Sequence, residues 1–228
     1  MNSILLYNLY PKNHWKPLTA QLLKDVPHTH IAINVTLDFW DKIFKKNSIR
    51  LFLTSIPKVK FILFTENDTK LGETKGFEHF RKQINFNDYG IATYIHSKGV
   101  TKPNNPNIND WVEMMRYFQI DRFDLCQEVF REGYQLYGVN LGKYSGGEKY
   151  GPFKFSDFHF SGTFVSVNLN LLKDKFLNTP IDKDYFGIEG FFGKLCPYEK
   201  AFCAHDSGEI INNHYHEPYP SEIYKTQY

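Results

Sequence analysis

The chain has 228 residues, of which 42% are hydrophobic and 23% are charged, values typical of a folded globular protein. A formal net charge of +2 without a long basic block argues against a nucleic-acid-binding protein. No apolar run is long enough to span a membrane, and the first residues turn polar too soon for a signal peptide.

A chain of this length can bury one sizeable core, so we expect a single domain over residues 1–228, either alone or within a longer protein. The cysteines are odd in number and lack metal-ligand spacing, which favours a reduced, cytosolic protein. Peripheral attachment to a membrane stays open. Aromatic residues reach 17%, a density that suits sugar or base pockets but also follows from codon bias. The three cysteines are Cys126, Cys196 and Cys203.

In the first half of the chain, β-prone apolar runs alternate with segments of helical spacing. We expect strands at 3–9, 30–37, 58–65 and 89–95, and helices at 15–26, 38–46 and 76–84. Such alternation predicts an α/β fold with a mixed, mostly parallel sheet flanked by helices.

The second half begins with a long helix, for which Asn109 is the expected N-cap and Asp121 marks a break. A glycine- and lysine-rich segment at 142–152 is typical of a mobile loop, and the tail 212–228 is expected to be irregular. The remaining expected elements are strands at 134–141, 157–167 and 201–205 and helices at 169–176 and 185–195.

The segment 94–103 ends an apolar run with a polar cluster. His96, Ser97, Lys98 and Gly99 follow one another, and Pro103 then blocks further regular structure. Ligands of open α/β sheets bind at the carboxyl ends of strands. This strand end therefore suits an anion such as phosphate, and the alternative is a solvated turn.

Several familiar motifs are missing from the sequence. It contains no G-x-G-x-x-G and no G-x-x-x-x-G-K-[ST], which weakens dinucleotide-oxidoreductase and P-loop interpretations. It also has no G-x-S-x-G and no H-E-x-x-H, so common hydrolase and zinc-protease interpretations lose support.

Two other segments suit a binding or catalytic site. Small polar residues interrupt the aromatic segment 159–164, where Gly162 permits close approach of a ligand, although a β-bulge is the alternative. Glu189 stands among aromatic residues, so burial would raise the pKa of its carboxyl and suit it to general base catalysis. Its alternative is a surface position on the helix.

The tail 214–220 is dense in side chains that bind sugars, metals or phosphates. His214 and His216 have the spacing that can place two imidazoles on one side of an extended segment, and a solvated tail is the alternative. A D-x-D that binds a divalent cation would follow a strand. Here 182–184 has that spacing but precedes a helix, and Glu66-Asn67-Asp68 is the nearest imitation after a strand.

The ordered set of motifs resembles a group of GT-A-like (Rossmann-like) glycosyltransferases with members in bacteria, eukaryotes and large DNA viruses. The similarity spans nearly the whole chain, and Tyr7, Asn8, Asn13 and Trp15 also fit it. The motifs are Y-I-H-S-K-G-V-T-K at 94–102, D-W-x-x-x-M-x-Y-F at 110–118, G-V-N at 138–140, H-F-S-G-T-F at 159–164, E-x-F at 189–191 and H-Y-x-x-P-Y-P at 214–220.

The resemblance implies roles for individual residues. Glu189 would be the catalytic base, and His159 would lie with Ser161 and Gly162 beneath the donor or acceptor sugar. The segment His96 to Gly99 would replace a metal-binding D-x-D. The implied donor-binding residues are Tyr7, Asn8, Trp15, His96, Ser97, Lys98, Gly99, Ser161, Gly162, His214, Tyr215 and His216.

The resemblance further implies transfer of a hexose, deoxyhexose or pentose from a nucleoside diphosphate sugar, such as a UDP-sugar, to a hydroxyl of a glycan-type acceptor. Mn²⁺ or Mg²⁺ would be held by Asp68 and His216, or Lys98 and a histidine would replace the metal. The alternatives are a carbohydrate-binding or inactive transferase-like module and a nucleotidyl- or phosphotransferase. The expected compartment is the cytosol, that of the host if the protein is viral.

Overall fold

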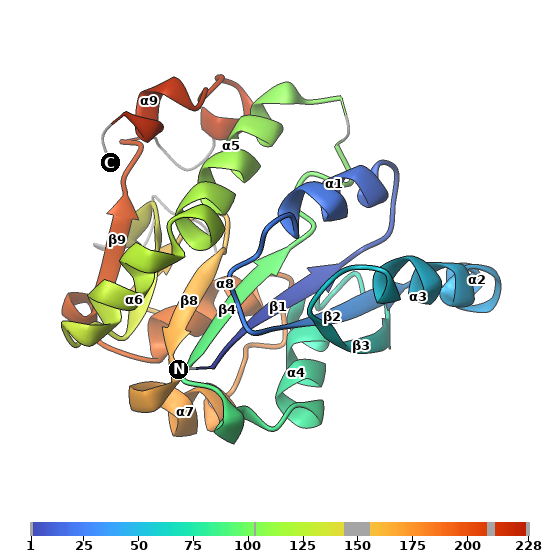
Figure 1. The fold of residues 1–228 in the computed structure, drawn as a ribbon, viewed down its shortest axis with the longest axis horizontal. Helices are drawn as coiled ribbons and strands as arrows, with labels where there is room; N and C mark the ends of the chain where they lie inside the picture. Colours follow the sequence, from blue (N-terminus) through green and yellow to red (C-terminus); the bar gives the residue numbers. More distant parts are fainter. Residues whose placement is uncertain (1, 103, 144–155, 209–212, 227–228) are drawn as a thin grey trace.

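Strand β1 (Ser3–Leu9) is buried along its whole length, and its alternating side chains point into two separate hydrophobic layers. Leu5 and Leu9 enter one layer, whereas Ile4 and Leu6 enter the other. A strand buried on both sides belongs in the interior of a sheet covered by helices on both faces. The computed structural model, which describes residues 2–102, 104–143, 156–208 and 213–226, shows this arrangement (Figure 1).

The central sheet has seven strands in the order β3-β2-β1-β4-β8-β5-β9. Strands β1 to β4 are mutually parallel, β8 runs antiparallel to both of its neighbours, and β9 is parallel to β5. The expectation of a mixed, mostly parallel α/β sheet flanked by helices is confirmed. The further strands are β2 (His30–Leu37), β3 (Val59–Glu66), β4 (Ile91–His96), β5 (Leu136–Val139), β8 (Val165–Asn168) and β9 (Ala201–His205).

Helices cover both faces of this sheet (Figure 1). One layer contains α1 (Trp15–Leu22), α3 (Lys46–Thr54), α5 (Pro106–Arg116) and α6 (Phe123–Arg131). The other layer contains α4 (Thr74–Gln83), α7 (Leu169–Asn178) and α8 (Gly187–Phe191). Short 3₁₀ turns lie at Phe86–Asp88, Phe192–Lys194, Tyr198–Lys200 and Asn213–Tyr215.

The chain order places a topological switch between β1 and β4. From β1 the chain proceeds to β2 and β3 on one side, and it then crosses back to β4 on the other side. The connections therefore diverge where the carboxyl ends of β1 and β4 lie side by side. In open α/β sheets, ligands bind in the crevice at such a point.

The expected strand at 157–167 is wrong as a single element. The structure has β7 (Phe158–Phe160), which pairs with the short β6 (Leu141–Lys143), and the separate strand β8. Between them Gly162 and Thr163 have φ of 89° and 58°, a left-handed backbone that ends the strand. An ideal Cβ on Gly162 would lie 2.4 Å from Met115 Sδ, so this turn requires glycine.

Several expected boundaries also move. The long helix begins at Pro106 rather than near Asn109, because Asn105 accepts a hydrogen bond from Asn107 N and proline suits the first helical position. The break near Asp121 is confirmed as a π-helical turn at Tyr117–Asp121.

Other segments differ as well. The expected helix 38–46 is the slightly shorter α2 (Phe39–Phe44), and the following helix α3 was not predicted. The expected helix 185–195 is the shorter α8, and the tail contains α9 (Glu222–Lys225). Of the expected mobile loop, residues 142–143 belong to β6 and 144–152 lie outside the described residues.

Candidate functional site

Ser97 joins the carboxyl ends of β1 and β4. Its backbone N donates to Asn8 O at 3.0 Å, and its hydroxyl accepts from Tyr10 N at 2.8 Å. Gly99 follows with φ of 82°, and a Cβ there would lie 2.5 Å from Ile108 Cγ2. The Ser97 hydroxyl and the Gly99 backbone therefore shape the loop after β4.

A buried polar network begins beneath this loop and runs across the sheet. Asn34 Nδ2 donates to Asn8 Oδ1 at 3.0 Å, and the Asn8 side chain also hydrogen-bonds Tyr94. Gly76 of α4 makes room for this pair, since an ideal Cβ would lie 2.3 Å from Asn8 Oδ1. Asn8, which is 5% exposed, thus supports the site from below and does not face an incoming ligand.

The network continues to the end of β4. Tyr94 donates from its hydroxyl to Glu73 Oε2 at 2.7 Å, and Glu73 Oε1 contacts His96 Nδ1. The other ring nitrogen of His96 donates to Gly162 O at 3.0 Å, because a carbonyl can only accept. Glu73 and Gly162 thereby fix both edges of the imidazole and connect β4 to the turn before β8.

Lys98 lies between two half-buried carboxylates and two aromatic rings. Its Nζ is 3.9 Å from the ring centroid of Trp111 and 5.7 Å from that of Tyr215. Glu189 and Glu73 both interact with its charge. The half-buried ammonium thus has cation–π contacts with two rings and favourable electrostatic interactions with two carboxylates.

Charges and burial shift the pKa values of these groups. Burial raises the pKa of Glu189 and Glu73 adds to the rise, whereas Lys98 and His96 oppose it. Burial lowers the pKa of Lys98, and the two carboxylates oppose that change. Burial also acts to raise the pKa of Glu73, but His96, Tyr94 and Lys98 outweigh it and lower the pKa overall. Glu189 is therefore the better proton acceptor of the two carboxylates.

Aromatic side chains surround this cluster. Burial raises the pKa of Tyr185, to which Glu73, Glu189 and Tyr215 also contribute, so these groups lie near one another. Tyr185 is 58% exposed. Together with Tyr215 it presents aromatic surface beside the carboxylates, a combination that suits a sugar ring.

A second polar cluster lies at the carboxyl ends of β2 and β3, on the same edge of the sheet. Asp38 accepts from Tyr10 Oη at 3.0 Å, from Asn67 Nδ2 at 2.8 Å and from Lys12 Nζ at 2.6 Å. The hydrogen bond from Lys12 lowers the pKa of Asp38 despite partial burial. In doubly wound folds a carboxylate after the second strand binds the ribose of a nucleotide.

Two of the expected donor-binding residues lie away from the cluster. Tyr7 is fully buried and its hydroxyl lies 3.0 Å from Thr19 Oγ1, because its strand position points into the helix-covered layer. Trp15 begins α1 and packs edge-on against Phe52 of α3 at 5.2 Å. We therefore do not retain Tyr7 and Trp15 as donor contacts.

The residues around β7 divide into two groups. His159 is 3% exposed and pairs with Gly142 of β6, and burial lowers the pKa of its imidazole to about 4. A neutral, buried imidazole at this position is part of the core, so we do not retain His159 as a catalytic residue. Ser161 N donates to Asn140 O at 3.0 Å. Gly162 contacts the site through its carbonyl oxygen, which accepts from His96.

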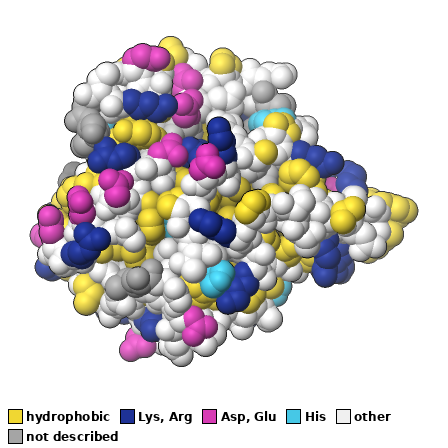
Figure 2. Space-filling model, in the orientation of Figure 1, with side chains coloured by type: hydrophobic (Ala, Val, Ile, Leu, Met, Phe, Trp, Pro, Cys, Tyr) yellow, Lys and Arg dark blue, Asp and Glu magenta, His cyan; other side chains and the backbone are white. Residues whose placement is uncertain are grey.

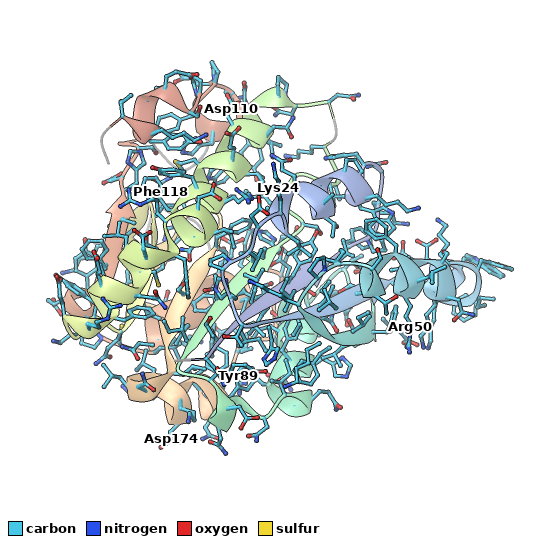
Figure 3. The ribbon with its side chains drawn as sticks, viewed as in Figure 1. Lys24, Arg50, Tyr89, Asp110, Phe118 and Asp174 are labelled. Carbon is cyan, nitrogen blue, oxygen red and sulfur yellow. The ribbon has the colours of Figure 1, made fainter. Side chains whose placement is uncertain are left out.

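The tail lies over α5, where Asp110 Oδ2 accepts from Tyr219 N at 3.0 Å (Figure 3). His214 is 3% exposed, stacks on Trp111 at 5.0 Å and lies 3.0 Å from Ser207 Oγ. Of the three expected tail residues, only Tyr215 contacts Lys98. His214 stacks on Trp111 instead, and His216 is exposed.

The structure does not bring the expected metal ligands together. Asp68 follows the edge strand β3 and accepts from Lys70 N, while His216 belongs to the tail beside α5. Within the part of the chain that the structure describes, no three His, Cys, Asp or Glu side chains gather closely enough to hold a metal ion. At the end of β4 both ring nitrogens of His96 are engaged and Lys98 is a cation, so these residues do not fit a divalent cation.

Sequence reasoning missed Glu73, Trp111 and Asp38. Glu73 is the N-cap of α4 in a polar turn, and no local pattern connects it to β4. Trp111 has the spacing of a core position on α5, and it is indeed 2% exposed. Asp38 directly follows the expected second strand, a position from which its role could have been predicted.

A separate cavity of about 680 Å³ lies near the amino-terminal ends of β2 and β3. Its lining includes Leu23, Phe52 and Ile56, and Lys58 Nζ at its border donates to Val26 O. This cavity lies at the opposite edge of the sheet from the carboxylate cluster, so it is not the candidate site.

No protein-family model matches the chain, and no curated protein matches its sequence. Among solved structures, S. aureus TarS 1–349 in complex with UDP-GlcNAc is 12% identical, with 85% of this chain and 54% of that chain covered at a TM-score of 0.42. HddC from Yersinia pseudotuberculosis is 12% identical over 90% of this chain and 91% of its own, with a TM-score of 0.43. The chain thus spans about half the length of the TarS chain that it matches. Likenesses this distant decide no function, which has to be inferred from the residues of the site.

Proposed function

We propose that this chain is a glycosyltransferase that transfers a sugar from a nucleoside diphosphate sugar to a hydroxyl group. The observation that carries the proposal is Glu189, a half-buried carboxylate of raised pKa that interacts with Lys98 at the switch between β1 and β4. A base of raised pKa that interacts with a cation is what displacement of a diphosphate by a hydroxyl requires.

In the proposed reaction Glu189 accepts the proton of the acceptor hydroxyl as its oxygen bonds to the anomeric carbon. The bond from that carbon to the diphosphate oxygen breaks, and its electron pair leaves with the diphosphate. Lys98 stabilises the departing charge, because its ammonium lies in a partly desolvated position where electrostatic attraction is strong. Direct displacement of this kind inverts the anomeric configuration.

The remaining residues of the site position these groups. Glu73 and Gly162 hold His96 at the end of β4, and Trp111 and Tyr215 hold the side chain of Lys98. Asp38 lies on the same edge of the sheet and suits the ribose of the donor. Lys98 and Glu189 are also the residues to which the resemblance of the ordered motifs assigned donor binding and base catalysis.

A single substitution tests the assignment of the base. We expect Glu189→Gln to abolish sugar transfer and donor hydrolysis while nucleoside diphosphate binding persists, as measured by calorimetry with a panel of nucleotide sugars. The neutral side chain is not expected to lower the Tm, because burial penalises only the ionised carboxylate. Glu128→Gln on the exposed face of α6 is the matched control.

Other outcomes distinguish the alternatives. Retention of most activity by Glu189→Gln means that another group is the base. Glycan binding without any donor turnover identifies a carbohydrate-binding module. Cleavage between the α- and β-phosphates, with release of a nucleoside monophosphate, identifies a nucleotidyl- or phosphotransferase.

The choice of sugar, the acceptor and the part played by Mn²⁺ or Mg²⁺ are tested by the same panel run with each cation and with a chelator. We keep the reduced, cytosolic compartment as part of the proposal, since Cys126, Cys196 and Cys203 are free thiols in the structure.

A further inference from the structure

Helix α2 has an inverted distribution of polar and apolar side chains. Its apolar residues Phe39, Trp40, Ile43 and Phe44 are between 55% and 74% exposed, whereas Asp41 is only 7% exposed. A surface helix of a water-soluble protein normally places its apolar residues inward. The side chains form a hydrophobic tip at the end of the molecule, visible at the right of Figure 2.

Ion pairs hold this inverted orientation in place. Asp41 pairs with Lys12 at 3.1 Å, a contact that anchors α2 to the loop after β1, and with Lys45 at 2.7 Å at the end of the same helix. The Trp40 ring stacks on Phe44 at 6.1 Å and meets Phe39 edge-on at 5.3 Å. The outward apolar face is therefore an ordered surface, in which the aromatic rings pack on one another.

Basic side chains surround the tip (Figure 2). Residues 39–54, which form α2 and α3, contain four lysines and arginines and one aspartate, a net charge of +3, and of these cations Lys42 pairs with Glu66 at 2.6 Å and Lys45 with Asp41 at 2.7 Å. Lys46 and Arg50 of α3 lie over the ring of Phe64 at 4.9 and 5.1 Å, and Arg50 is labelled in Figure 3. The two helices that form and support the hydrophobic tip thus carry an excess of positive charge.

We propose that the hydrophobic tip of α2, with the basic residues of α2 and α3, docks on an anionic lipid surface. Phenylalanine and tryptophan are the side chains that enter the boundary between headgroups and acyl chains. The surrounding cations meet the lipid phosphates, and each adds favourable free energy close to the membrane surface.

Charge also distinguishes this occupant from a second copy of the chain. A two-fold interface through the tip would place Lys46 and Arg50 against the same cations of the other copy. An anionic bilayer instead satisfies both the apolar and the basic side chains. No helix in the described ranges could cross a membrane, so the contact would be peripheral.

The position of α2 gives the docking a consequence for the rest of the molecule. Helix α2 directly follows the carboxyl end of β2, the edge of the sheet that also carries Asp38 and Lys98. Docking through the tip therefore brings that edge toward the lipid surface. The docking itself does not depend on the proposed transferase activity.

The test is sedimentation of the full chain with vesicles of phosphatidylcholine alone and of phosphatidylcholine with about 30% phosphatidylglycerol. We expect co-sedimentation with the anionic vesicles, weakened by added salt, and little with the neutral ones. Trp40 should shift to shorter emission wavelengths and be quenched by brominated lipid. Equal or absent binding to both vesicle types overturns the proposal.

Variants locate the contact. Trp40→Ser/Phe44→Ser is expected to weaken partition by about tenfold or more, and Lys46→Gln/Arg50→Gln by about tenfold. Leu171→Ser/Lys175→Gln on α7, which removes a similarly exposed apolar residue and a lysine elsewhere, should bind like the wild type. Circular dichroism confirms folding of each variant.

Two results count against the proposal. Unchanged vesicle binding by Trp40→Ser/Phe44→Ser shows that another surface binds the lipid. A concentration-dependent dimer in light scattering that this variant abolishes, without vesicle binding by the wild type, shows that the tip is a self-association surface.

Discussion

Lys98 controls the charge on Glu189. The raised pKa of Glu189 results first from burial, and Lys98 is the largest opposing influence. The lysine thereby opposes the rise that burial causes in the pKa of Glu189 and favours the ionised carboxylate. Its proposed role toward the departing diphosphate comes in addition to this effect on the base.

The pH dependence of activity tests this relation. Glu189 has to be deprotonated to act as a base, so activity falls as the pH drops through its pKa. Lys98→Met removes a charge that lowers this pKa, so the acid limb of kcat/KM should move to higher pH, with kcat reduced by about a hundredfold. Measurement of kcat/KM from about pH 5 to pH 9 checks the shift.

Lys102→Met is the matched control, since Lys102 lies over Tyr215 at 4.2 Å and not among the charges that act on Glu189. Its acid limb should coincide with that of the wild type. An acid limb that is unmoved in Lys98→Met, or moved to lower pH, contradicts the coupling of the two groups.

At the scale of single residues, the sequence indicated those members of the proposed site that lie at a strand end. Lys98 follows an apolar run, and the loop after such a run faces the edge where ligands bind. Tyr7 was placed wrongly because it and Asn8 are neighbours in sequence but point to opposite faces of β1. Glu73 needed the tertiary contact with His96, which no local pattern encodes.

Among the elements, the turn between β7 and β8 positions the carbonyl oxygen that accepts a hydrogen bond from His96. Gly162 has φ of 89° and its carbonyl receives the imidazole N–H, while Trp111 and Met115 close the space above its Cα. Apolar alternation around 157–167 predicted one strand because the left-handed residues within it leave that alternation intact.

Gly162→Ala is expected to lower the free energy of unfolding by about 2 to 4 kcal/mol, combining left-handed backbone strain with overpacking against Met115 and Trp111. Gly133→Ala is the control, because Gly133 has φ of 95° but a Cβ there meets nothing within 4 Å. Urea denaturation should show a loss of only about 1 to 2 kcal/mol for the control. Equal losses for both variants would mean that the contacts above Gly162 are unimportant.

At the scale of the whole molecule, α/β alternation predicted the sheet well, since β1, β2 and β4 of the parallel half are mostly apolar and almost fully buried. The antiparallel insertion of β8 between β4 and β5 was not predictable, because a strand's direction depends on the path of its connections. The helices that cover both faces bury several histidines within this framework, and burial lowers the pKa of His28 and of His159 the furthest.

These histidines make the fold sensitive to acid. Burial and the charge of Lys58 lower the pKa of His28 to about 3, and burial lowers that of His159 to about 4. Below the unfolded value of about 6.5 the unfolded chain binds protons that the folded chain does not, so stability present above that pH is lost as the pH falls.

The free energy of unfolding should therefore fall by about 2 to 3 kcal/mol per pH unit between about pH 6 and pH 5, with about half from each histidine. Urea denaturation at several pH values measures the slope, and His28→Gln should reduce it by about half. Exposed His216 provides the control, His216→Gln. A slope that His28→Gln leaves unchanged contradicts this account.

Gly76 has a consequence for how the sequence can change over time. Its missing side chain accommodates Asn8 and Asn34, since an ideal Cβ would lie 2.3 Å from one amide and 2.6 Å from the other. A larger residue in α4 becomes acceptable only when one of these asparagines has already become smaller, and that change breaks the bond between them. Substitutions at positions 8, 34 and 76 are therefore expected to be accepted together, so that these three positions covary.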